Sequence, residues 1–185
     1  MILLYLLSPG LDRFMSKILF AERDGVQVLK FIGDVRVSMG PTISTFLNRL
    51  SQCKNFKSIV IDLTETNSID STSLGLLAKI SLVTQEIFKS VPTIVSPNED
   101  ITRILMSMGF DEVFIILDRL FTECGQLGEL PMEIISEVNL RDQVIEAHKV
   151  LMSLNNQNKN AFCDLVDALE NEGVAESSLP RNRVA

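Results

Sequence analysis

The hydrophobic and polar positions first suggest two neighbouring strands near the N-terminus. The apolar segments KILFAER (17–23) and VQVLKFIG (26–33) flank Asp24-Gly25, a dipeptide that favours a two-residue turn between antiparallel strands. We therefore expect a β-hairpin over these residues.

The next segment, GPTISTFLNRLSQ (40–52), has the spacing of a helix, and Pro41 suits a first helical turn. Its apolar positions follow the i, i+3, i+4, i+7 pattern of one helix face: Ile43, Phe46, Leu47 and Leu50. The next segment, SIVIDL (58–63), is short, apolar and rich in β-branched residues. This composition predicts a central strand covered on both faces.

A polar loop, TETNSID (64–70), precedes a second predicted helix that ends at Val91-Pro92. The apolar stripe of this helix consists of Leu76, Ile80, Val83 and Ile87, widened by Leu74 and Leu77. After it come a predicted strand, a helix and a last strand at PTIVS (92–96), PNEDITRILMSMG (97–109) and EVFII (112–116). The order ββαβαβαβ predicts an α/β fold: a mixed sheet with helices packed on it and parallel βαβ crossovers.

The pattern changes after Leu117, where a connector containing Gly and Pro leads to two helical segments. Apolar residues recur at Leu140, Val144, Ala147, Leu151 and Leu154, and again at Phe162, Leu165, Val166 and Leu169. We expect an antiparallel helical hairpin as a C-terminal extension. Its seam is too short to establish a coiled coil, so a homodimer through these helices, a wider partner surface and packing onto its own domain stay open.

Three regions follow from this pattern: an N-terminal extension (1–15), a central domain (16–117) and an acidic helical extension (118–185). The apolar run at residues 2–7 is too short for a membrane span and has neither preceding basic residues nor a cleavage site. We interpret residues 1–15 as an upstream translation start or as a segment foreign to the native protein.

Composition narrows the classes of function. The net charge is −7, and residues 117–185 carry 12 acidic but 6 basic side chains. Without a basic stripe or tryptophan, the chain does not resemble a nucleic-acid-binding protein. Cys53, Cys124 and Cys163 form no CxxC pair, so we expect reduced thiols in a cytoplasmic protein and neither a disulfide framework nor a metal site.

Catalytic motifs of the common hydrolase, zinc-protease, P-loop and dinucleotide classes do not occur in the sequence. The single histidine, His148, lies on the first C-terminal helix without an evident nucleophile as partner, and we interpret it as a surface or packing residue. The sequence thus predicts no catalytic residues, no cofactor and no enzyme activity.

Four small polar residues, Asp70, Ser71, Thr72 and Ser73, stand directly before the second helix. Capping of the helix by Asp70 and Ser71 is the simplest interpretation, since their oxygens accept hydrogen bonds from backbone N–H groups. A helix start also tolerates a phosphate, which would add roughly −1.5 to −2 charges there. The local chemistry leaves both roles open.

The run SIVIDLTETNSIDSTSLGLLAKI (58–80) resembles the signature of the STAS domain of bacterial anti-sigma factor antagonists. Membership implies a phosphorylation-regulated protein that binds an anti-sigma factor, which is also a serine kinase, and that a PPM-type serine phosphatase resets. The resemblance places the phosphorylation site at Ser71, with Thr72 as the secondary candidate. The implied partner-binding residues are Asp70, Ser71, Thr72, Ser73, Leu74 and Leu77. The alternative is a STAS scaffold or ligand-sensing interaction module that is not phosphorylated.

Overall fold

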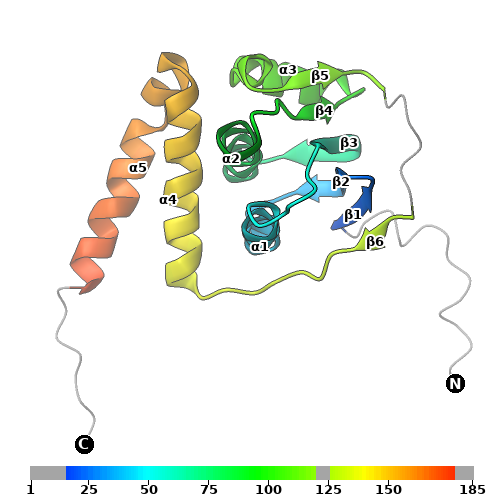
Figure 1. Cartoon of the computed structure of the whole chain (residues 1–185). Helices are drawn as coiled ribbons and strands as arrows, with labels where there is room; N and C mark the ends of the chain where they lie inside the picture. Colours follow the sequence, from blue (N-terminus) through cyan, green and yellow to red (C-terminus); the bar gives the residue numbers. More distant parts are fainter. Residues whose placement is uncertain (1–15, 120–125, 178–185) are drawn as a thin grey trace, which may run out of the picture.

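The computed structural model describes residues 16–119 and 126–177 (Figure 1). Its strands are β1 (Lys17–Arg23), β2 (Val26–Val35), β3 (Ser58–Ile69), β4 (Thr93–Val95), β5 (Ile115–Leu117) and β6 (Gly128–Glu129). The α-helices are α1 (Gly40–Leu50), α2 (Ser71–Phe88), α3 (Glu99–Ser107), α4 (Glu137–Leu154) and α5 (Asn156–Ser177), and the short 3₁₀ helices are η2 (Val37–Met39) and η3 (Phe110–Glu112). The predicted N-terminal extension and Cys124 lie outside the described residues, while Cys53 and Cys163 are free thiols.

The strands form one mixed sheet in the order β5-β4-β3-β2-β1-β6. β1 and β2 are antiparallel, and β2, β3, β4 and β5 pair in parallel, so the predicted ββαβαβαβ order and α/β fold are confirmed. Asp24 and Gly25 form the expected turn, with φ of 54° and 84°. The pattern did not predict β6, which spans two residues and pairs with β1 across a large sequence separation.

The predicted polar loop at 64–70 is wrong, because β3 continues to Ile69. Two irregularities in the β2–β3 register accommodate this polar part of the strand, between Lys30 and Ile32 and between Gly33 and Asp34. The polar side chains find partners on β2: Thr66 Oγ1 donates to the carbonyl of Phe31 at 3.2 Å, and Ser68 Oγ donates to Asp34 Oδ1 at 2.7 Å. A polar strand is stable here because its neighbour supplies the acceptors.

Other boundaries also differ from the predictions. Residues 110–112 form η3, so the last strand of the parallel part begins only at Ile115. Ile87, assigned to the apolar stripe of the second helix, is 48% exposed. The C-terminal helical hairpin is present, and Asn155 alone separates its two helices.

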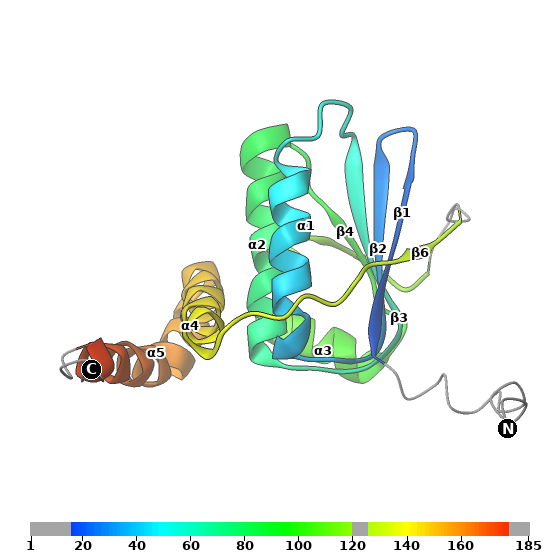
Figure 2. The same ribbon diagram turned by 90° about the horizontal axis from the view of Figure 1, so that it is seen from below.

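The elements are arranged in layers (Figure 2). Helices α1 and α2 lie on one face of the sheet, α4 crosses the outer side of α2, and α5 lies beyond α4. Alternate residues of the central strand, Ile59, Ile61 and Leu63, are fully buried in the core, whereas Val60 between them is only half-buried. The predicted central strand is confirmed, and the face that carries Val60 is covered less completely than the face that carries Ile59, Ile61 and Leu63.

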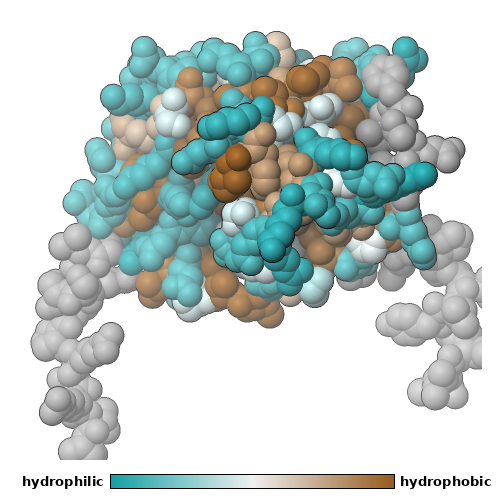
Figure 3. Space-filling view, in the orientation of Figure 1, coloured by the Kyte–Doolittle hydropathy of each residue, from teal (hydrophilic) through white to brown (hydrophobic). Residues whose placement is uncertain are grey.

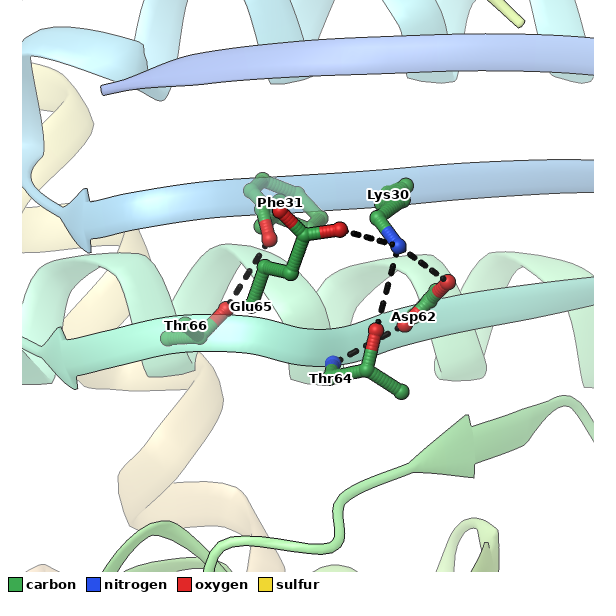
Figure 4. Close-up of polar contacts among 6 residues, drawn as sticks. All are labelled: Lys30, Phe31, Asp62, Thr64, Glu65 and Thr66. Atoms are coloured by element: carbon green, nitrogen blue, oxygen red, sulfur yellow. Dashed lines mark hydrogen bonds and ion pairs between the residues drawn. The ribbon is translucent and has the colours of Figure 1, made fainter. Parts of the chain in front are cut away.

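An ion-pair cluster joins β2 to β3 near the first irregularity (Figure 4). Lys30 Nζ lies 3.4 Å from Asp62 Oδ2 and 2.9 Å from Glu65 Oε1, and it donates to Thr64 Oγ1 at 3.1 Å. Burial lowers the pKa of Lys30, but the hydrogen bonds and negative charges of Glu65 and Asp62 outweigh burial and leave it raised above 10.5. The Asp62 side chain is 1% exposed, so the attraction of Lys30 offsets part of the cost of removing the carboxylate from water.

Candidate interaction site at the start of α2

Asp70 is the N-cap of α2 and also fixes the preceding chain. One carboxylate oxygen accepts from the N–H of Ser73 at 2.7 Å, and the other accepts from the N–H of Val37 at 2.7 Å. The Asp70 N–H donates in turn to the carbonyl of Val35. Asp70 thus ties the helix start to the end of β2, and both of its oxygens are used within the fold.

Ser71, the first residue of α2, does not cap the helix as one interpretation of the sequence expected. Its Oγ lies 2.9 Å from Nε2 of His148, which is 77 residues further along the chain on α4. The expectation that His148 lacks a nucleophile as partner is therefore wrong. The imidazole of His148 is 2% exposed and also meets the ring of Phe162, at 5.0 Å between ring centres.

The hydrogen bonds of His148 define which atom donates. Nδ1 lies 2.8 Å from the carbonyl oxygen of Val144, and this oxygen can only accept. We assign the proton of the neutral ring to Nδ1, which leaves Nε2 as the acceptor for the hydroxyl of Ser71. The resulting Ser71–His148–Val144 chain of hydrogen bonds holds α4 to the first turn of α2.

Two further contacts bring α4 against the same side of α2. A Cβ on Gly75 would overlap with the carbonyl oxygen of Ala147, so α4 approaches closely because residue 75 has no side chain. One turn later, Lys79 Nζ and Glu146 Oε1 form an ion pair of 2.7 Å. Positions 71, 75 and 79 therefore form one stripe of α2, and α4 covers it.

The predicted partner-binding residues differ in how far they reach the surface. Asp70 and Ser71 are half-buried, whereas the rest are buried: Thr72, Ser73, Leu74 and Leu77, at 6%, 0%, 2% and 0% exposure. Leu74 and Leu77 belong to the hydrophobic core, so they support the site from below. Ser71 is the predicted hydroxyl nearest to solvent, but its oxygen faces α4.

Sequence reasoning missed the role of His148, although one signal was present. His148 follows Val144 by four residues and precedes Leu151 by three, which places it on the apolar seam of its helix. A histidine on a seam must find a polar partner when the seam is buried. The identity of that partner required the tertiary structure.

A second polar feature lies at the carboxyl ends of β2 and β3. It is a cavity of about 280 Å³ lined by Ile32, Gly33, Thr64, Glu65, Thr66, Asn67 and Asn98. Crevices at the carboxyl ends of parallel strands commonly bind ligands. Within the described part of the chain, no group of three or more His, Cys, Asp or Glu side chains is placed to hold a metal ion.

The fold and this helix start define an α/β domain whose second helix is capped by Asp70 and carries the hydroxyl of Ser71 in its first turn. The family model of the STAS domain matches residues 17–126, more than half of the chain. This chain belongs to the STAS domain family, as the resemblance predicted.

Solved structures with a similar fold include anti-sigma factor antagonists. SpoIIAA in its unphosphorylated form is 12% identical, with 57% of this chain and 90% of that chain covered and a TM-score of 0.47. A Thermotoga maritima protein described as an anti-sigma factor antagonist is 26% identical (58% and 87% covered, TM-score 0.47). An antagonist from Mycobacterium paratuberculosis is 20% identical (57% and 88% covered, TM-score 0.46). No curated protein sequence matches this chain significantly.

The surface of the C-terminal helices is polar on the outside. The view of Figure 3 shows mainly hydrophilic residues where α4 and α5 lie, with hydrophobic residues between them. Exposed charged residues of α5 include Lys159, Asp164, Asp167, Glu170 and Glu172.

Among the described residues, no helix combines the length and the apolar character that crossing a membrane requires.

Proposed function

We propose that this chain is an anti-sigma factor antagonist that binds an anti-sigma factor with serine kinase activity through the start of α2. The supporting observation is that Asp70 and Ser71 have separate roles at the helix start. Asp70 caps the helix, so the hydroxyl of Ser71 in the family's motif position is not needed to hold the helix together. The protein acts in this proposal by binding and not by catalysis, in the bacterial cytoplasm.

Phosphorylation of Ser71 switches the interaction off in this proposal. The partner kinase transfers the γ-phosphoryl group of ATP to Ser71 Oγ: the new O–P bond forms, the bond to the leaving ADP breaks, and the hydroxyl proton is released. The phosphate adds roughly −1.5 to −2 charges next to Asp70, and burying it under a partner without a matching cation is costly. A PPM-type phosphatase restores the hydroxyl. Thr72 is the weaker candidate because it is 6% exposed.

The experiment compares Ser71→Ala with Ser71→Asp in pull-downs from the native bacterium, with captured proteins identified by mass spectrometry. We expect Ser71→Ala to retain an anti-sigma factor and Ser71→Asp to lose it. Ser51→Asp, at an exposed serine after α1, is the matched control for added charge. Equal capture of an anti-sigma factor by both Ser71 variants would overturn the switch.

A ligand-sensing module is the second candidate function, and the polar cavity between the ends of β2 and β3 favours it. Mass spectrometry after incubation with the captured kinase and ATP separates the two candidates. Phosphate on residues 70–73 supports the switch, and none after complete reaction of a control substrate supports the module.

A homodimer through the C-terminal helices would have to use side chains such as the exposed Leu165, because Ala147, Leu151 and Val166 are already buried within the chain.

A further inference from the structure

We propose that the α4–α5 hairpin is an intramolecular inhibitor of the site at the start of α2. In the closed form α4 packs over Ser71, and a kinase or a docking partner reaches this serine only after the hairpin has moved away. This inference rests on the proposed function, because it names the regulation of the same site.

The contacts place α4 where an incoming protein would have to dock. Ser71 Oγ is bonded to His148, Gly75 lies against the backbone of Ala147, and Lys79 pairs with Glu146. Kinases need the acceptor hydroxyl in line with the γ-phosphate and hydrogen-bonded to their own catalytic aspartate. The hydroxyl of Ser71 cannot take that position while it donates to His148.

The hairpin and the segment before it also contact the domain away from α2, which makes the position of the hairpin specific. Gln143 Nε2 donates to Ser44 Oγ on α1 at 2.8 Å. Near the end of α4, Asn155 and Asn158 both donate to the carbonyl of Met108, at 3.3 and 2.9 Å. Before α4, the Glu133 N–H donates to Thr42 Oγ1 at 3.0 Å.

The interface is also suited to opening. Its directional contacts are hydrogen bonds and one ion pair, which water can replace, and α4 also contributes Ala147 and Leu151 to the buried hydrophobic core. Interfaces of this mixed kind within one chain typically allow relative motion more easily than large apolar ones. Gln143 Oε1 is buried without a hydrogen-bond partner within the described residues, which disfavours the closed form. α5 packs on α4, so the two helices can leave together, and Ile134 in the preceding segment is 96% exposed.

Gly75→Ala is the variant that opens the hairpin with the smallest change to the domain. The three atoms nearest to the added Cβ all belong to the backbone of Ala147, so the clash pushes α4 away. The same substitution favours the helical state of α2. Gly128→Ala is the matched control, since the nearest atom to its Cβ is 4.0 Å away on β1.

The test uses the full chain with Ser71→Cys as an accessibility probe and with Cys53, Cys124 and Cys163 replaced by serine. The rate of reaction with dithionitrobenzoate should rise by at least about tenfold in Gly75→Ala and stay unchanged in Gly128→Ala, because thiol reactivity follows exposure. Opening also moves His148 away from the thiol. Loss of this neighbour can only slow the reaction, so a faster reaction reports greater exposure of the thiol. Hydrogen exchange should accelerate in α4 and α5 but not in β2 and β3.

An unchanged thiol rate together with protected α4 amides in Gly75→Ala would overturn the proposal. The proposal would also be overturned if the thiol introduced at position 71 reacted as fast in the closed form as in urea-unfolded protein. If Gly75→Ala loses protection throughout the sheet, the thiol rate is measured instead in His148→Ala, which removes the contact to Ser71 without adding atoms. A faster reaction in that variant supports the proposal, and an unchanged rate overturns it. None of these measurements needs a partner, so failure of the inhibitor and failure of the antagonist function are distinguishable.

Discussion

Helix α2 is packed on two sides in two different ways. Toward the sheet it buries Leu76, Leu77 and Ile80 in a continuous apolar core. Toward α4 it presents a serine, a glycine and a lysine, which form a hydrogen bond, a close backbone contact and an ion pair. The inner side depends mainly on apolar area removed from water, whereas the outer side combines a few directional contacts with the buried side chains of Ala147 and Leu151 on α4.

This difference indicates which side of α2 can lose its contacts without unfolding of the domain. Loss of the inner contacts exposes the core, so the domain unfolds as a unit. Loss of the outer contacts releases two helices that pack mainly on each other and on α2. Local opening of this kind needs less free energy than global unfolding, and regulatory elements are commonly drawn from such regions.

The largest effect is expected from Leu77→Ala on the inner side. Leu77 is fully buried, so the cavity should lower the free energy of unfolding by about 3 kcal/mol. Urea unfolding monitored by circular dichroism measures it. Leu82→Ala on the same helix is the control, because Leu82 is 37% exposed. Similar losses for both would contradict the role of Leu77 in the hydrophobic core.

Lys30→Met should lower the free energy of unfolding by about 2 kcal/mol, because Asp62 keeps one hydrogen bond but loses its cation. Urea unfolding again measures the change, with the exposed Lys54→Met as control. Hydrogen exchange should increase across the whole sheet and the hairpin together. A change confined to α4 and α5 would contradict the division between the two sides.

Val166→Ala probes the hairpin that packs on the outer side of α2. Val166 on α5 is 3% exposed, and two lost methyl groups should weaken the α4–α5 contact by about 1.5 kcal/mol. Hydrogen exchange should accelerate in α4 and α5, with the amides of β3 unchanged. The neighbouring Leu165→Ala is the matched control, since Leu165 is 42% exposed. Equal acceleration of β3 would show that the hairpin and the domain unfold together.

The smallest effect is the pH dependence that Lys30 contributes. Its pKa is raised in the folded protein, so its stabilising contribution is fully present below the pKa of the unfolded chain and is lost as the pH rises through the folded pKa. Above about pH 10, the urea midpoint of the wild type should therefore fall more steeply than that of Lys30→Met. Parallel decreases would assign the loss to other groups.

The sequence alone determined the order of the elements, the Asp24-Gly25 turn and the capped start of α2. These features depend on neighbours a few residues apart: alternation, helical spacing, and a carboxylate within reach of an N–H three residues on. The extended end of β3 was missed because its polar residues resemble a loop until β2 supplies their hydrogen-bond acceptors.

Only the tertiary structure decided what the hairpin covers. The apolar seam of α4 predicted that something packs on it, but a seam specifies a face and not its partner. The contact between Ser71 and His148 joins residues 77 positions apart, and Gly75 determines how closely the two helices approach. Such contacts follow from how whole elements pack, and no local rule encodes them.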